Sequence, residues 1–206
     1  MDIANTLKCD TNPHKTKIRL EDPLAVAKFS WDMNKRLNKL TTEKKRPLIM
    51  LCIGTDRSTG DCLGPLTGEK LDAANENEMI VYGTLEQPVH ASNLQETISE
   101  IKRNFDNPII IAIDACLGSA ENIGCIQIGE GSLQPGAGVN KNLPSVGDLH
   151  ITGVVNVGGF LEYMVLQNTR LNIVMKMSSL IAKGIQRALH QQKNCQTKND
   201  LFFYES

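Results

Sequence analysis

Two aspartates stand where apolar runs of the sequence give way to polar residues. Asp61 follows the run "PLIMLCIG" after the short loop "TDRSTG", and Asp114 ends the run "NPIIIAID". When two carboxyl groups lie close together their pKa values separate, so that one acts as a base while the other keeps a proton and acts as an acid. The same pair can instead hold a divalent metal. Helix N-caps or turn residues are the structural alternative for both positions.

Histidine is the other residue type here that could do chemistry. His150, in "GDLHITGVVN", is a candidate general base, or a third metal ligand beside Asp61 and Asp114, although a lone histidine is more often structural. His90, in "QPVHAS", lies near the same predicted edge and is assigned no role. We therefore predict no cofactor, with a divalent metal held by these three residues as the alternative.

Two loops could bind a substrate near these acids. In the loop after the first apolar run, backbone amides from Thr55 to Gly60 could hold an oxyanion, whereas a phosphate-binding loop is excluded because the Gly-Lys-Ser/Thr and GxGxxG patterns are missing. The Gly/Pro-rich segment "LQPGAGVNKNLPSVGD" is long for a compact domain, and such loops are often functional. We predict that its residues Gly136, Gly138 and Asn140 contact a substrate.

The elements that must position these residues alternate between strands and helices. Apolar runs without alternation predict strands buried on both faces at residues 47–54 and 107–114. Further strands are predicted at residues 79–85, 124–131 and 149–157, and helices at residues 22–40, 62–74, 91–105 and 160–191. This order predicts an α/β protein with a mostly parallel central sheet, in which ligands sit at the carboxyl ends of the strands.

We expect one domain overall with three segments. Residues 1–46 form an N-terminal arm and helix, residues 47–192 the α/β core, and residues 193–206 a frayed C-terminal tail, with residues 1–20 as a loose arm. The stripe predicted on the first helix is Leu24, Ala27, Trp31, Asn34 and Leu37. The buried face predicted on the last helix is Ile173, Met177, Leu180, Ile181, Gly184, Ile185 and Leu189.

The net charge, the apolar runs and the cysteine spacing argue against several classes of function. The net charge of −1 offers no basic field for nucleic acid or an acidic membrane face. No apolar run approaches the roughly 20 residues that cross a bilayer, and the N-terminus lacks the apolar core of a signal peptide, so we expect a cytoplasmic protein. The six cysteines lack metal-finger spacing and are expected to be reduced thiols.

Four stretches of the chain carry a family resemblance. The stretches "IGTDRSTGDCLGP", "IIIAIDACLG", "IQIGEGSLQPGAGVN" and "HITGVVNVGGF" together resemble the sporulation proteins of the YyaC type. More distantly, they are similar to the spore germination protease and the hydrogenase maturation proteases. The similarity runs from about Pro47 to about Gln191. It implies a three-layer α/β/α fold of the phosphorylase/hydrolase type.

The resemblance also implies roles for particular residues. In the germination protease an aspartate of the "GD-x-LGP"-like motif and one of the "IDA" motif are proposed to act together in peptide cleavage, and they match Asp61 and Asp114. In the hydrogenase maturation proteases the equivalent acids and a later histidine bind a metal, and His150 is the match for that histidine. The implied protein is a sporulation-associated endopeptidase of the forespore or spore core. Its substrate would be a protein or peptide such as a small acid-soluble spore protein.

Two other readings of the same sequence stay open. The protein is alternatively a sporulation factor that binds a peptide or protein partner without cleaving it, because fold and function separate easily. It is alternatively a metal-dependent peptidase. A homo-oligomer also stays open. The chain shows no clear equivalent of the processed N-terminal segment of the germination protease.

Overall fold

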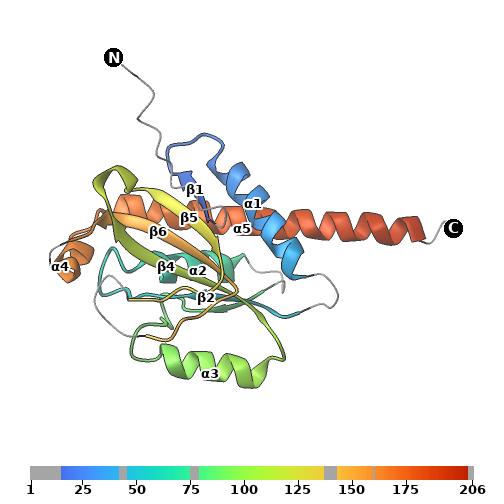
Figure 1. Ribbon diagram of the computed structural model, residues 1–206, viewed down its shortest axis with the longest axis horizontal. Helices are drawn as coiled ribbons and strands as arrows, with labels where there is room; N and C mark the ends of the chain where they lie inside the picture. The colour runs from blue at the N-terminus through green and yellow to red at the C-terminus, as the bar shows by residue number, and fades with distance from the viewer. Residues whose placement is uncertain (1–14, 42–45, 75–78, 137–142, 160, 204–206) are drawn as a thin grey trace, which may run out of the picture.

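The protein folds around one six-stranded sheet with the strand order β1-β5-β6-β4-β2-β3. The computed structural model describes residues 15–41, 46–74, 79–136, 143–159 and 161–203. Strands β2, β3, β4 and β6 run parallel to one another, whereas β5 runs antiparallel to both β6 and β1. Helices cover both faces of this sheet (Figure 1). The three-layer α/β/α class with a mostly parallel sheet is thus confirmed.

The elements follow one another along the chain much as the apolar patterns predict. The strands are β1 (Lys15–Arg19), β2 (Leu48–Cys52), β3 (Ile80–Tyr82), β4 (Ile109–Gly118), β5 (Cys125–Glu130) and β6 (Leu149–Val157). The helices are α1 (Ala25–Leu40), α2 (Leu63–Ala73), α3 (Leu94–Asn104), the short η1 (Ala120–Asn122), α4 (Glu162–Gln167) and α5 (Leu171–Phe203). In the described part of the chain no helix is long and apolar enough to cross a membrane.

Each face of the sheet builds its own hydrophobic core. Helices α1, α2 and α5 pack on one face, where Phe29, Leu71 and Ile181 are fully buried with alternate residues of the strands. Helix α3 packs alone on the other face, through Leu94, Ile98 and Ile101 (Figure 1). Because side chains of a strand alternate between its faces, Met50 and Ile111 point to the first core, and Leu51 and Ile110 to the second.

Strands β2 and β4 are neighbours, as the edge prediction requires. They pair in parallel from Leu48 opposite Ile109 to Cys52 opposite Ile113. β4 does not end at Asp114, as predicted, but continues to Gly118. The reason is its other neighbour, because β6 keeps pairing with β4 beyond the end of β2, with a register shift between Cys116 and Leu117. Asp114 therefore lies inside β4, at the first position beyond the residues of β4 that pair with β2.

Three terminal predictions were wrong. The supposedly loose arm contains β1, which pairs with β5 and buries Ile18. Helix α1 buries only Leu37 of the predicted stripe, since Trp31 is 66% exposed and Phe29 and Met33 contact the core instead. Helix α5 continues through much of the predicted frayed tail to Phe203 and runs past the body of the molecule (Figure 1). Its predicted buried face is otherwise confirmed, with Ile173 as the partly buried exception.

Candidate active site

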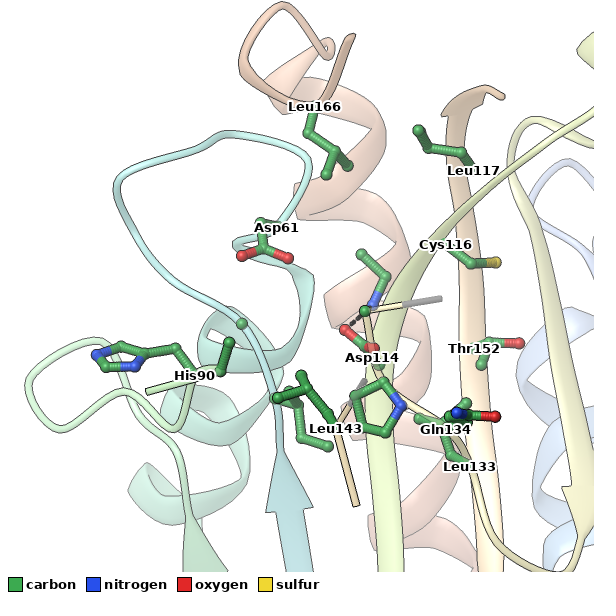
Figure 2. Close-up of a pocket in the computed structure, with 16 residues that line it drawn as sticks. Asp61, His90, Asp114, Cys116, Leu117, Leu133, Gln134, Leu143, Thr152 and Leu166 are labelled. Atoms are coloured by element: carbon green, nitrogen blue, oxygen red, sulfur yellow. Dashed lines mark hydrogen bonds between the residues drawn. The ribbon is translucent and has the colours of Figure 1, made fainter. Parts of the chain in front are cut away.

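A cavity of about 290 Å³ opens at the carboxyl ends of β2 and β4 (Figure 2). Both predicted acids, Asp61 and Asp114, line it. The wall is otherwise mostly apolar, with a few polar groups between the apolar ones. The full set of lining residues is Ile53, Gly54, Asp61, His90, Ala91, Asp114, Ala115, Cys116, Leu117, Leu133, Gln134, Pro135, Gly136, Leu143, Thr152 and Leu166.

Asp114 is the buried acid of the cavity. It extends from β4 on the sheet face that carries α3, and it is only 7% exposed. One carboxyl oxygen accepts the backbone N–H of Ala115 at 2.8 Å. Burial raises the pKa of Asp114 well above the usual carboxyl value, and the negative charge of Asp61 raises it further, against a smaller lowering effect of the Ala115 N–H. Asp114 is therefore the carboxyl group of the pair that keeps its proton to higher pH than an ordinary aspartate does.

Asp61 reaches the same cavity from the loop between β2 and α2 (Figure 2). It is partly exposed, in contrast to Asp114. The backbone around it is fixed, because the carbonyl of Asp61 accepts the N–H of Thr55 at 3.1 Å and the preceding Gly60 N–H binds the carbonyl of Leu166 at 2.8 Å. The negative charge of Asp61 raises the pKa of Asp114, so the two carboxyl groups interact electrostatically.

Three of the six loop amides predicted to hold an oxyanion, from Thr55 to Gly60, are bonded within the protein. The N–H groups of Thr55 and Gly60 already donate to Asp61 and Leu166, and that of Arg57 donates to the Thr55 hydroxyl at 3.3 Å. Neither Thr55 nor Gly60 lines the cavity. These amides close the loop on itself and on α4, which explains why they are not presented to a ligand.

The second predicted substrate loop is described in part. Gly136 lines the cavity together with its neighbours Leu133, Gln134 and Pro135. Gly138 and Asn140 lie outside the described residues. The side chain of Leu143, where the description of the chain resumes, also lines the cavity. The described residues of this segment thus line the same cavity as the two acids. Their role in substrate binding stays a prediction.

His150 is not brought together with the acids. It lies on β6, two residues before the cavity residue Thr152, and is buried with its ring Nδ1 3.0 Å from the carbonyl oxygen of Gly131. The ring packs over Gly129, where an added Cβ would lie 2.3 Å from Nε2. Burial lowers the pKa of His150, against the raising effect of the Gly131 carbonyl. Among the residues that the structure describes, no three His, Cys, Asp or Glu side chains are placed to hold a metal ion.

Sequence reasoning gave no role in the site to several residues that line the cavity. Cys116 and Thr152 line the floor beside Asp114, and His90 lies at the opposite side, with Nδ1 accepting the N–H of Ser92 at 3.3 Å (Figure 2). Burial raises the pKa of Cys116 to about 11, and Asp114 adds to this, so the thiol is neutral and unreactive at pH 7. Spacing could have revealed Cys116, because it lies two residues after Asp114 on one strand and so shares its face.

These features define a class of protein: a three-layer α/β protein with an interacting aspartate pair in a cavity at the carboxyl ends of parallel strands. The chain belongs to the family described as "Protein of unknown function (DUF1256)", whose model matches residues 17–184. It is 57% identical over 140 residues to the "Uncharacterized protein YyaC" of Bacillus subtilis (strain 168), which covers 68% of each chain. The resemblance to the YyaC type is thus confirmed.

A solved structure also matches the chain. It is the crystal structure of a (NiFe) hydrogenase maturation protease, HycI, from Thermococcus kodakarensis KOD1. The match has a TM-score of 0.43 and 16% sequence identity, and it covers 75% of this chain and 98% of that chain.

Proposed function

We propose that this protein is an endopeptidase that hydrolyses peptide bonds with Asp61 and Asp114. The observation that carries this proposal is the meeting of two carboxyl groups of unlike surroundings in one cavity, one buried and one partly exposed. Unlike surroundings separate the pKa values of neighbouring carboxyl groups, which gives an acid and a base at the same pH.

The roles of the two residues follow from those surroundings. Asp61 is the general base that takes a proton from water, whose oxygen then attacks the carbonyl carbon of the peptide bond. Asp114 is the general acid that gives its proton to the departing nitrogen as the C–N bond breaks. A proton then moves from Asp61 to Asp114, so that one water is consumed and the pair returns to its starting state.

The walls of the cavity favour a polypeptide as the substrate. Leu117, Leu133, Leu143 and Leu166 surround the acids, and no Lys or Arg is among the described residues that line the cavity. Such a lining suits uncharged backbone with apolar side chains better than an anionic metabolite. Family resemblance suggests small acid-soluble spore proteins as substrates, and a forespore location for the reaction.

The direct test is the cleavage of small acid-soluble spore proteins by purified Asp61→Asn and Asp114→Asn variants. We expect each change to lower kcat by at least about 10²-fold, since each removes one proton-transfer group. Asp56→Asn is the matched control, because Asp56 is an exposed acid of the same loop that does not line the cavity. Full cleavage by both site variants would overturn the proposal.

One observation favours a second candidate function, the binding of a peptide without cleavage. Three of the six loop amides predicted to stabilise an oxyanion, those of Thr55, Arg57 and Gly60, are bonded within the protein and do not face a tetrahedral intermediate as free donors. Calorimetric titration of the same spore proteins into wild-type protein, with mass spectrometry of the mixture afterwards, separates the two functions. Binding with intact substrate would favour the second candidate. Cleavage that a chelator abolishes would instead favour a metal-dependent peptidase.

A further inference from the structure

Helix α4 connects the cavity wall to the backbone that carries Asp61. The helix lies between β6 and α5, and its residue Leu166 lines the cavity. The backbone carbonyl of Leu166 accepts the N–H of Gly60 at 2.8 Å. Because Gly60 directly precedes Asp61, any movement of α4 is passed to the backbone of the candidate base.

Two side chains outside the cavity hold α4 in this place. The Nδ2 group of Asn156, on β6, donates to the carbonyl of Val165 at 3.2 Å and to the hydroxyl of Thr169 at 3.3 Å. The Thr169 hydroxyl in turn donates to the Val165 carbonyl at 2.9 Å. The Thr169 residue is only 6% exposed, so these bonds are partly shielded from competing water.

The loop that carries Asp61 packs closely against the end of α4, with no space for a side chain at position 60. A Cβ atom added at Gly60 would lie 2.8 Å from both Leu166 Cδ2 and Thr169 Oγ1, and 3.0 Å from the Leu166 carbonyl oxygen. Thr169 therefore touches the glycine beside the candidate base and also binds Asn156. Asn156 is anchored to the sheet by its place on β6, opposite Leu117 of β4, the strand that carries Asp114.

We propose that Asn156 and Thr169 are positioning residues, which fix the separation of the Asp61 and Asp114 carboxyl groups through α4 and the Gly60–Leu166 hydrogen bond. This inference rests on the proposed function for its catalytic consequence, but its geometry can be tested alone. The chain of contacts runs from the sheet that carries one acid to the loop that carries the other. Loss of either side chain releases the loop while both acids remain.

The kinetic test compares Asn156→Ala and Thr169→Val with two matched controls. We expect kcat to fall about 10- to 100-fold with KM changed less than about twofold, because a shift near 1 Å at a reacting group can have effects of this size. Thr169→Ser keeps the hydroxyl and should restore most of kcat. Asn168→Ala removes an exposed bond to the Met164 carbonyl within α4, and should leave kcat unchanged.

A readout without substrate keeps the two proposals apart. In NMR hydrogen exchange the Gly60 amide should exchange at least about 10-fold faster in Asn156→Ala and Thr169→Val than in the wild type. Crystal structures of both variants should show a longer distance between the Asp61 and Asp114 carboxyl groups than in the wild type. If the wild type cleaves nothing, the proposed function fails while these measurements still decide the positioning role. An unchanged Gly60 exchange rate and an unchanged carboxyl separation would overturn it.

Discussion

The two carboxyl groups of the site differ chiefly in how water reaches them. Asp114 is enclosed by the sheet and keeps one backbone N–H as a partner, whereas Asp61 stands on a partly exposed loop. Desolvation penalises the charged form of a carboxyl group, so the shared proton belongs on Asp114. The residue that the protein buries is therefore the one suited to donate a proton.

Burial of Asp114 should make the stability of the protein depend on pH. In the unfolded chain this carboxyl group loses its proton near the usual value of 3.8, whereas the folded protein holds the proton to higher pH. The free energy of unfolding of the wild type therefore falls as pH rises from about that value to the raised pKa. We expect Asp114→Asn to have a higher Tm than the wild type at pH 7, with the difference vanishing at pH 3.

Thermal unfolding by circular dichroism between pH 3 and pH 8 measures this effect. Asn keeps the acceptor oxygen for the Ala115 N–H, so the comparison isolates the ionisation. Asp56→Asn makes the same exchange at an exposed position and is the control for the substitution itself. A Tm difference for Asp114→Asn that stays constant over the whole range would contradict the assignment of the proton.

At the scale of elements, the sequence predicted the strands better than the way they end. The apolar run before Asp114 correctly indicated a buried parallel strand, and the neighbour relation of β2 and β4 followed the βαβ order. The extension of β4 to Gly118 depends on its pairing with β6, a contact between distant residues that a local pattern cannot reveal. The exposed side of α1 was misjudged because Leu24 and Trp31 share the apolar character of the buried residues.

A buried arginine of α1 forms ion pairs within the helix and with the antiparallel side of the sheet. The Arg36 side chain is 7% exposed and binds Asp32 at 2.7 Å and Glu130 of β5 at 3.3 Å. Removal of one partner from a buried pair leaves a desolvated charge, so we expect Arg36→Leu to lower the free energy of unfolding by about 3–5 kcal/mol.

Lys39 provides the matched control for that prediction. It binds the same carboxylate, Glu130, at 2.8 Å, but its side chain is 59% exposed. Lys39→Ala should therefore change the free energy of unfolding by less than about 1 kcal/mol. Urea unfolding measures the free energy of unfolding of both variants. Equal decreases for Arg36→Leu and Lys39→Ala would show that burial does not set the strength of these ion pairs.

At the scale of the whole molecule, the site is assembled from segments between Ile53 and Leu166. The sequence indicated the two aspartates because each follows an apolar run. It did not indicate that the helix predicted over residues 160–191 is interrupted, so that α4 stands apart from α5 and brings Leu166 to the cavity. The family resemblance matched His150 to a metal ligand beside the acids, but this residue does not line the cavity, and its ring Nδ1 lies 3.0 Å from the Gly131 carbonyl oxygen.

The first described strand completes the molecule at one edge of the sheet. β1 pairs with β5 over its whole length, from Lys15 opposite Gly129 to Arg19 opposite Cys125. Deletion of residues 1–20 would uncover the hydrogen-bonding edge of β5, and exposed edges pair with other chains. We expect the truncated protein to unfold at lower temperature and to elute as larger species in size-exclusion chromatography. Deletion of residues 1–12, which keeps β1, is the control, and a monomeric 1–20 deletion with wild-type Tm would refute the role of β1.

The fit of the His150 imidazole over Gly129 has a consequence for the evolution of the family. The two residues face each other across β5 and β6, and the ring occupies the volume that any side chain at position 129 would need. A substitution at position 129 is thus tolerated only after position 150 has shrunk. Aligned relatives should accordingly keep Gly at position 129 wherever position 150 carries a large side chain, and combinations with a bulky residue at both positions should be missing.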